Sequence, residues 1–144
     1  GEWGHLSLPI FGIFSDKKYV KKNMHEMQIQ KFISGKGLEK LYGKKISAHK
    51  IFNKKNKNLR DKKFIKEFKL RLARSLTTLI YTIDPDAIVF GGGLSNELNF
   101  LNEIKLLLIK SLKIKDLNTI FLKPQFGDAS GVRGAAMLGR KLIY

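Results

Sequence analysis

Three consecutive glycines at positions 91–93 are the stretch of this sequence that most clearly suits the binding of a ligand. A short apolar run, residues 87–90, precedes them, and the polar pair Ser95 and Asn96 follows at the expected start of a helix. A strand that runs into a glycine turn at a helix N-terminus brings backbone N–H groups close to a nucleotide in many α/β proteins. Glycine has no Cβ, so it permits positive φ and close approach of a flat ligand. A ligand-free turn has the same local signature, so the neighbouring segments must decide.

A second candidate group lies at the start of the chain, in the sequence Glu2-Trp3-Gly4-His5. Glu2 and His5 are separated by a spacing that suits two polar groups converging on one small ligand. A carboxylate accepts hydrogen bonds from sugar hydroxyls, and an imidazole can donate or accept. On spacing alone, a surface turn with incidental polar residues is the simpler interpretation.

The elements that would position these groups alternate between helices and short strands. Residues 59–83 carry apolar side chains at spacings of three and four, which predicts a long amphipathic helix that packs on the core. Its charges, Arg71 included, lie largely off the apolar stripe and are given no special role. Asp84-Pro85-Asp86 ends it, so a short buried strand is expected at residues 87–90. The elements predicted beyond this strand are a helix from residue 95 or 96 to about 112, a strand at 119–122, a polar glycine loop at 126–131 and a helix from about 132 to 142. This order predicts an α/β fold with parallel strands and a right-handed crossover.

The first part of the chain is predicted to be less regular. Residues 16–27 are charged and read as an exposed loop or arm. A helix that begins near Gln28 should be broken or bent at residues 34–37, and Gly43 should close the short helix that follows. In the last helix, the small residues 134–136 predict close packing against a sheet.

Composition narrows the class of protein. The chain has no cysteine, which excludes disulfides and thiolate metal sites, and no apolar run approaches the length of a membrane span. A cytoplasmic protein without a membrane partner is therefore expected. The net charge of +16 comes mostly from lysine, with few interleaved aromatics, so specific nucleic-acid binding is not expected. The chain begins at glycine and reads as a fragment.

Four separated segments together resemble one family, the ROK-family sugar kinases. These segments are residues 1–9 (with Glu-Trp-Gly-His and Leu-Pro), 32–37 (Phe-Ile-Ser-Gly-Lys-Gly), 83–96 and 127–136. The pattern is most similar to bacterial fructokinases, with N-acetylglucosamine kinases next. The resemblance covers nearly all of the chain, but only the C-terminal half of the family's length. It implies that residues 1–144 form the C-terminal lobe of a two-lobed, actin-like (ribonuclease-H-like) ATPase fold.

The resemblance also implies a nucleotide site and a sugar site. The residues that would border the adenosine of ATP are Gly91, Gly92, Gly93, Ser95 and Asn96. Those that would face the sugar hydroxyls are Glu2, His5 and Gln30. Gln30 stands where the family has a glutamate, and an amide must donate at one end, so sugar affinity or specificity should change. The catalytic aspartate and both phosphate-binding loops lie upstream in the family, so no catalytic residue is expected here and Mg²⁺ would be held mainly by the missing half.

The zinc site of the family is the clearest departure. Counting back from residue 32, the three cysteine positions hold Lys21, Asn23 and Gln28, and His5 matches the remaining ligand. One imidazole does not hold Zn²⁺ in a tetrahedral structural site. The nearby side chains that offer incomplete substitutes are Asp16, His25 and Glu26. We therefore predict no zinc, and an arm over residues 16–31 that is looser than in the family.

Three hypotheses follow. The first is the C-terminal half of an ATP-dependent hexose kinase that is inactive alone and allows a homodimer at full length. The second is a fragment of a sugar-responsive repressor, since the same family includes such proteins with an added helix-turn-helix. The third is a degenerate homologue without catalysis. A phosphate-binding loop encoded upstream of residue 1 would favour the first, and a helix-turn-helix there would favour the second.

Overall fold

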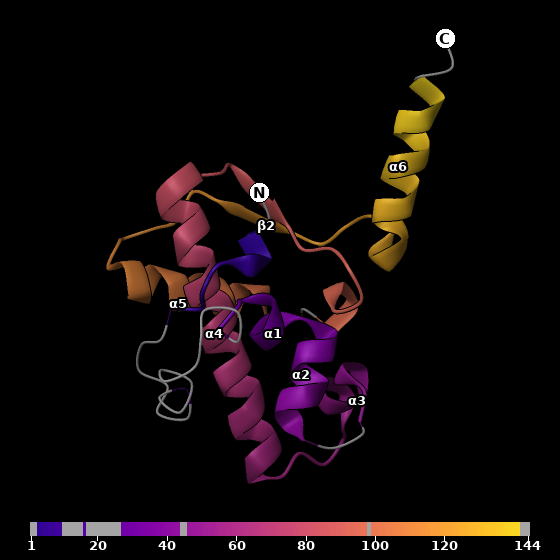
Figure 1. The fold of residues 1–144 in the computed structure, drawn as a ribbon. Helices are drawn as coiled ribbons and strands as arrows, with labels where there is room; N and C mark the ends of the chain where they lie inside the picture. The colour runs from indigo at the N-terminus through magenta and orange to yellow at the C-terminus, as the bar shows by residue number, and fades with distance from the viewer. Residues whose placement is uncertain (1–2, 10–15, 17–26, 44–45, 98, 142–144) are drawn as a thin grey trace.

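The computed structural model of the chain describes residues 3–9, 16, 27–43, 46–97 and 99–141 (Figure 1). Its elements, in order, are η1 (Trp3–His5), α1 (Gln30–Ile33), α2 (Gly35–Tyr42), α3 (Ala48–Asn53), α4 (Leu59–Ile83), β1 (Ala87–Val89), η3 (Ser95–Glu97), α5 (Leu101–Leu112), β2 (Ile120–Leu122), η4 (Gly127–Ala129) and α6 (Ser130–Lys141), where η denotes a 3-10 helix. Among these described elements, no helix is both long and apolar enough to cross a lipid bilayer.

The two strands form a small parallel sheet, as the sequence predicts. Ala87 of β1 pairs with Ile120 of β2, and Val89 pairs with Leu122. The backbone N–H of Phe90 extends the ladder by donating to the carbonyl of Leu122 at 3.0 Å. Helix α5 supplies the crossover that two parallel strands require.

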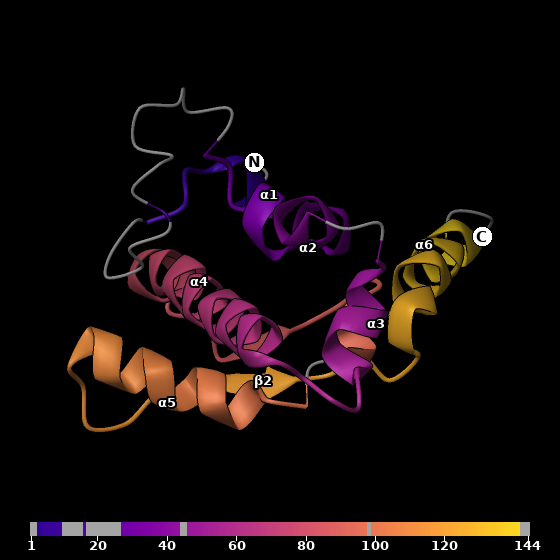
Figure 2. The ribbon, with the colours of Figure 1, turned by 90° about the horizontal axis from the view of Figure 1, so that it is seen from below.

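Helix α4 is the centre of the fold. It lies between the α1–α2 pair on one side and α5 with β2 on the other (Figure 2). Most of its apolar stripe is buried as predicted, with Phe68, Leu72 and Leu76 all at most 5% exposed, but Ile83 at its end is 65% exposed. At its N-terminus, Asn58 and Asp61 form a capping box, in which each side chain accepts from the other residue's backbone N–H.

The break between α1 and α2 is built by two small residues. Ser34 leaves the helical region with ψ 160° and caps α2 by accepting from the N–H of Gly37. A Cβ on Gly37 would lie 2.4 Å from the carbonyl oxygen of Lys31, so only glycine fits at this position. Gly43 ends α2 with φ 75°, as the sequence predicts.

The prediction of a buried first strand is wrong. Val89 and Ile120 are each 58% exposed, and Leu122 is 44% exposed. Only the central residue of each strand is half-buried. One face of the sheet packs on the helices, and no described element covers the other. The apolar composition of a strand indicates that it becomes buried, but not whether the covering element belongs to the same segment of chain.

Helix α6 also departs from expectation. It begins at Ser130 instead of residue 132, and Gly127–Ala129 forms the 3-10 turn η4 where a loop is predicted. Its small residues 134–136 are exposed, because α6 contacts η4 and then extends away from the rest of the molecule (Figure 1).

The start of α5 is later than predicted. Residues 95–97 form the separate turn η3, and α5 begins at Leu101 without a side-chain cap. Ser95 is therefore not the N-cap of this helix. The expected buried face is retained in part, since Ile104, Leu108 and Leu112 are buried.

The prediction that residues 16–27 form an exposed arm is wrong for the two ends that the structure describes, because both are buried. Asp16 is fully buried and accepts two hydrogen bonds from Arg71 of α4, at 3.0 and 2.6 Å. Met27 and Ile29 are also buried, and Leu8 donates its backbone N–H to the carbonyl of Met27. Residues 17–26 lie outside the described part of the chain. Arg71 is therefore not a solvent-facing charge, because a buried carboxylate requires a cation with good geometry.

Replacing Arg71 tests the importance of this ion pair for stability. We expect Arg71→Met to lower the free energy of unfolding by about 3–5 kcal/mol, since it leaves Asp16 charged and buried. Urea unfolding followed by circular dichroism measures the change. The control is Lys63→Met, at an exposed position of α4. The double variant Asp16→Leu/Arg71→Met should recover most of the loss, and a single variant as stable as the wild type would contradict the assignment.

A second polar cluster gives the fold a dependence on pH. Asp61 is 1% exposed and accepts from the Lys54 ammonium at 2.6 Å, from the Tyr42 hydroxyl and from the backbone N–H of Asn58. These donors, with Lys54 first, lower the pKa of Asp61 from 3.8 to about 2. The hydrogen bond that the Tyr42 hydroxyl donates to Asp61 also raises the pKa of this hydroxyl.

Acid titration tests this cluster. Because the folded pKa of Asp61 lies below the unfolded value, the unfolded chain binds more protons between roughly pH 4 and 2. The stabilisation from Asp61 is therefore present above about pH 4 and is lost as the pH falls through the folded pKa. We expect Asp61→Asn to lower the urea midpoint at pH 6 and to flatten its fall below pH 4. Asp116→Asn, at an exposed carboxylate, is the control. Parallel profiles for wild type and Asp61→Asn would rule out this role.

Candidate functional site

The predicted glycine turn directly follows β1 and is closed by a hydrogen bond from the N–H of Ser95 to the carbonyl of Gly92, at 2.9 Å. Gly92 has φ 83°, a conformation that other residues adopt rarely. Gly91 and Gly93 do not have this left-handed conformation, and a Cβ on any of the three glycines would meet no atom within 4 Å. The turn therefore needs glycine at its centre for its conformation, while the flanking positions leave open space beside the backbone.

The glycine loop predicted at residues 126–131 lies beside the segment that follows the glycine turn at residues 91–93. Turn η3, which carries Ser95 and Asn96, contacts η4 at Gly127–Ala129. Gly127 has φ 56°, and a Cβ there would lie 3.4 Å from Oδ1 of Asn96. The structure thus brings together two segments that are about 30 residues apart in the sequence, and Gly127 is small enough for this close approach.

Two hydroxyl groups in this region lack hydrogen-bond partners among the described residues. Ser95 is 1% exposed and its Oγ is buried without a partner, and the same holds for Oγ of Ser130 at the start of α6. A buried, unpaired hydroxyl costs about 1–3 kcal/mol, so such groups usually bind water or a ligand. Asn96 is exposed beside them. These polar groups fit a site that binds a polar ligand.

The α2 N-terminus forms another side of this region. A Cβ on Gly35, the first residue of α2, would lie 3.9 Å from Cγ of Leu94, which directly follows the glycine turn. The segment at residues 34–37 and the glycine turn, both singled out by the sequence, are therefore neighbours.

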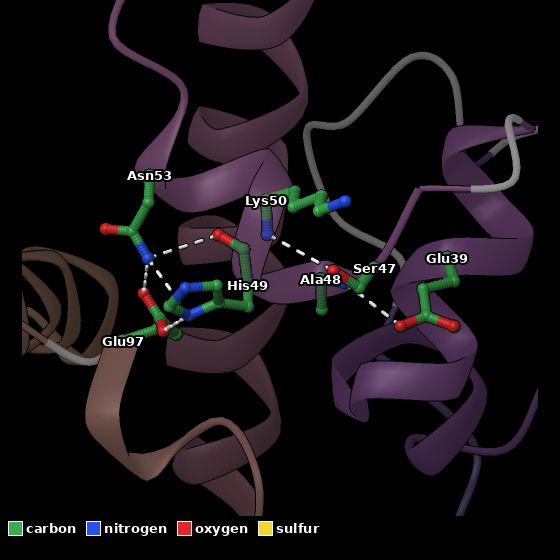
Figure 3. Close-up of polar contacts among 7 residues, drawn as sticks. All are labelled: Glu39, Ser47, Ala48, His49, Lys50, Asn53 and Glu97. Carbon is green, nitrogen blue, oxygen red and sulfur yellow. Dashed lines mark hydrogen bonds and ion pairs between the residues drawn. The ribbon is translucent and has the colours of Figure 1, made fainter.

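Helix α3 contributes a polar network that sequence reasoning missed (Figure 3). Glu97, at the end of η3, is 8% exposed and accepts from Nδ2 of Asn53 at 2.5 Å. Its other oxygen pairs with Nδ1 of His49. His49 and Asn53 are four residues apart, and this spacing places them on one face of a helix, which was the available signal. The partner lies 48 residues from His49, and no local pattern indicates it.

Two of the three candidate sugar residues are described, because Glu2 is outside the described residues. His5 is exposed in η1, and Gln30 is exposed at the start of α1. A Cβ on Gly4 would lie 3.4 Å from Cβ of Gln30, so the turn that carries His5 lies against α1. Nε1 of Trp3 donates to Oγ1 of Thr78 at 3.0 Å, which fixes this turn to α4.

The zinc prediction falls mostly outside the described residues, because Lys21, Asn23, His25 and Glu26 belong to the undescribed range. Gln28 is described, and it forms an isolated antiparallel bridge with Ser7. Within the described ranges, no three His, Cys, Asp or Glu side chains are placed to hold a metal ion together. The absence of zinc stays a prediction.

Comparisons with known proteins agree on one family. The profile of the ROK family matches residues 1–141. An N-acetyl-D-glucosamine kinase of Pectobacterium carotovorum is 36% identical, over 96% of this chain and 48% of its own length. Another, from Photobacterium profundum, is 31% identical over 98% of this chain and 50% of its own length. The chain thus spans about half the length of the curated relatives it matches.

A solved structure supports the fold. A candidate N-acetylmannosamine kinase from Listeria monocytogenes superposes with a TM-score of 0.67 at 24% identity, over 94% of this chain and 45% of its own length. The expected α/β fold of the actin-like class is confirmed. The particular similarity to fructokinases is not confirmed, since the relatives reported above are named as N-acetyl-D-glucosamine kinases. Matched along residues 1–141 by one family profile, the chain belongs to the ROK family.

Proposed function

We propose that this chain is the nucleotide-binding, C-terminal half of an ATP-dependent hexose kinase. One observation carries the proposal: in a ROK-family chain, the glycine turn at residues 91–93 leads into turn η3, which contacts turn η4, and we call these three turns the candidate nucleotide wall. The wall is open where Gly91 and Gly93 present bare backbone. Among hexoses, the names of the relatives favour N-acetyl-D-glucosamine over fructose as the substrate.

The residues of this wall fit an adenosine. Backbone at Gly91 and Gly93 allows a flat base to approach, and the exposed amide of Asn96 offers polar contacts. ATP, when bound, supplies the γ-phosphoryl group that the reaction transfers. Phosphoryl transfer depends on positioning and on neutralising charge, so the role of this chain is to hold the nucleotide.

The sugar would lie near η1 and α1. His5 and Gln30 come from neighbouring elements, and Glu2 precedes the same turn in the sequence. Histidine and glutamine both donate and accept hydrogen bonds, which suits sugar hydroxyls or an acetamido group. Trp3, fixed between these residues and α4, provides a rigid support for the turn.

The exposed apolar surface supports a further part of the protein that completes the fold. All-parallel sheets are normally covered on both faces, whereas here Val89, Ile120 and Leu122 are exposed. Val132, Met137 and Leu138 of α6 are exposed as well, at 67–76%. In our proposal, residues encoded upstream cover this surface and supply the general base, the phosphate contacts and the Mg²⁺ ligands.

A degenerate, non-catalytic protein is the second candidate. The observation that favours it is the replacement of expected ligands, with Gln28 and Gln30 at positions where the family has a cysteine and a glutamate. Such a protein would keep the fold but would neither bind ATP nor phosphorylate sugar.

Substitution of Gly93 tests the nucleotide wall. We expect Gly93→Ala to weaken ATP binding at least tenfold, because its methyl group would occupy space that no atom of the protein fills. The stability to urea should not change, because φ at this position is not in the left-handed region. Isothermal titration calorimetry measures the affinity. Gly139→Ala in α6, where an added Cβ also meets open space, is the matched control. Equal affinities for wild type and Gly93→Ala would contradict the proposed wall.

A coupled assay of ADP release tests whether this chain lacks the groups that catalyse phosphoryl transfer. We expect no phosphorylation of N-acetylglucosamine or fructose by the 144-residue chain, because the general base is proposed to lie upstream. The polypeptide extended by the residues encoded before residue 1 should release ADP when sugar is added. Turnover by the chain alone would refute this proposal, and an inactive extended protein would favour the degenerate alternative.

A further inference from the structure

Glu97 is a buried carboxylate at a critical position. It ends η3, the turn that carries Ser95 and Asn96, and its side chain is 7% exposed. A buried carboxylate is costly unless donors compensate its charge. The conformation of η3 therefore depends on which groups bind Glu97.

Both donors come from one face of α3 (Figure 3). Nδ1 of His49 pairs with Oε1 of Glu97, and Nδ2 of Asn53 donates to Oε2 at 2.5 Å and to the carbonyl of His49 at 3.2 Å. A carboxylate only accepts, so Nδ1 of His49 must carry a proton. The contact therefore forms with the neutral Nδ1–H imidazole as well as with the charged one.

Other cations near Glu97 have different partners. Lys57 and Lys69 line the same 250 Å³ cavity as Glu97. However, Lys69 pairs with Glu103 at 2.7 Å, and Lys57 donates to the carbonyl of Lys54 at 2.9 Å. Among the described residues, the side chains that bind the carboxylate of Glu97 are therefore His49 and Asn53.

Helix α3 is itself fixed on its opposite side. Ser47 caps the helix, and the N–H of Ala48 donates to Oε1 of Glu39 on α2, at 3.0 Å. Ala48 and Ile51 are buried in the core. A contact from α3 to η3 thus joins the candidate nucleotide wall to a firmly held element.

We propose that His49, Asn53 and Glu97 form a clamp that sets the position of η3, and through it the affinity of the nucleotide site. The three are positioning residues, and their role rests on the proposed function. Loss of the clamp frees η3 to move relative to the glycine turn. The nucleotide must then order η3 when it binds, and this ordering costs binding free energy. This penalty applies equally to the ground state and the transition state, so it raises the KM for ATP and leaves kcat unchanged.

Calorimetry on the 144-residue chain tests the clamp, with ATP as the probe. We expect His49→Ala to weaken ATP binding about tenfold, the typical effect of losing a hydrogen bond to a charged group. His49→Asn should restore most of the affinity, because its amide nitrogen can donate from the position of Nδ1. Glu97→Ala should resemble His49→Ala, because it removes both acceptor oxygens, and the double variant should be no weaker than either single one, since both break the same contact. Lys50→Ala, at the next exposed residue of α3, is the control.

The outcomes separate this inference from the proposed function. Wild-type chain that does not bind ATP would overturn both. If the wild-type chain binds ATP, and the variants His49→Ala and Glu97→Ala bind it with the same affinity, the clamp alone is overturned. In the upstream-extended polypeptide, a tenfold higher KM for ATP with unchanged kcat supports the clamp, while a lower kcat at unchanged KM contradicts it. Urea unfolding of each variant shows whether a loss of affinity merely reflects unfolding, and a variant that loses affinity while it stays folded supports the clamp.

Discussion

Burial of the apolar stripe of α4 is the constraint on which the rest of this structure depends. Phe68, Leu72 and Leu76 are at most 5% exposed, and each such side chain contributes about 1.5–3 kcal/mol through the hydrophobic effect. The aromatic rings of Phe52 and Phe100 pack on Phe68 at 5.3 and 5.9 Å, so α3 and the start of α5 are placed by the same helix. Because α3 and η3 both lie beside this cluster, the candidate nucleotide wall takes its position from α4.

The polar contacts of α4 place the other candidate group. Thr78 holds Trp3, and Arg71 binds Asp16 from a segment 55 residues away. Each contact is specific in direction, whereas the apolar stripe alone would allow these segments to slide. Hydrophobic burial therefore fixes which elements meet, and the buried polar pairs fix how they are aligned.

Sequence reasoning succeeded where the signal is local. The period of α4, the break at Ser34, the glycine turn and the parallel pairing of β1 with β2 all follow from short patterns. It failed where partners are distant in sequence: Arg71 has the spacing of a solvent-facing charge, and nothing near it indicates Asp16. The prediction of a buried strand failed for another reason: its apolar composition indicates burial, but no element among the described residues covers the outer face of the two strands.

Three kinds of contact define the candidate nucleotide wall, and they differ in how they resist change. The strand ladder from Phe90 to Leu122 uses backbone atoms, which side-chain substitutions do not remove. The close approach of Gly127 to Asn96 is steric, so nearly any replacement of Gly127 disturbs it, and the φ of 56° adds to the cost. The third contact, between Glu97 and α3, uses side chains alone, and His49 is 72% exposed. An exposed histidine can be replaced without opening a cavity in the core, so this contact can change while the fold persists. If the proposed nucleotide site is correct, His49 is therefore the position where a substitution changes nucleotide affinity at the smallest cost in stability.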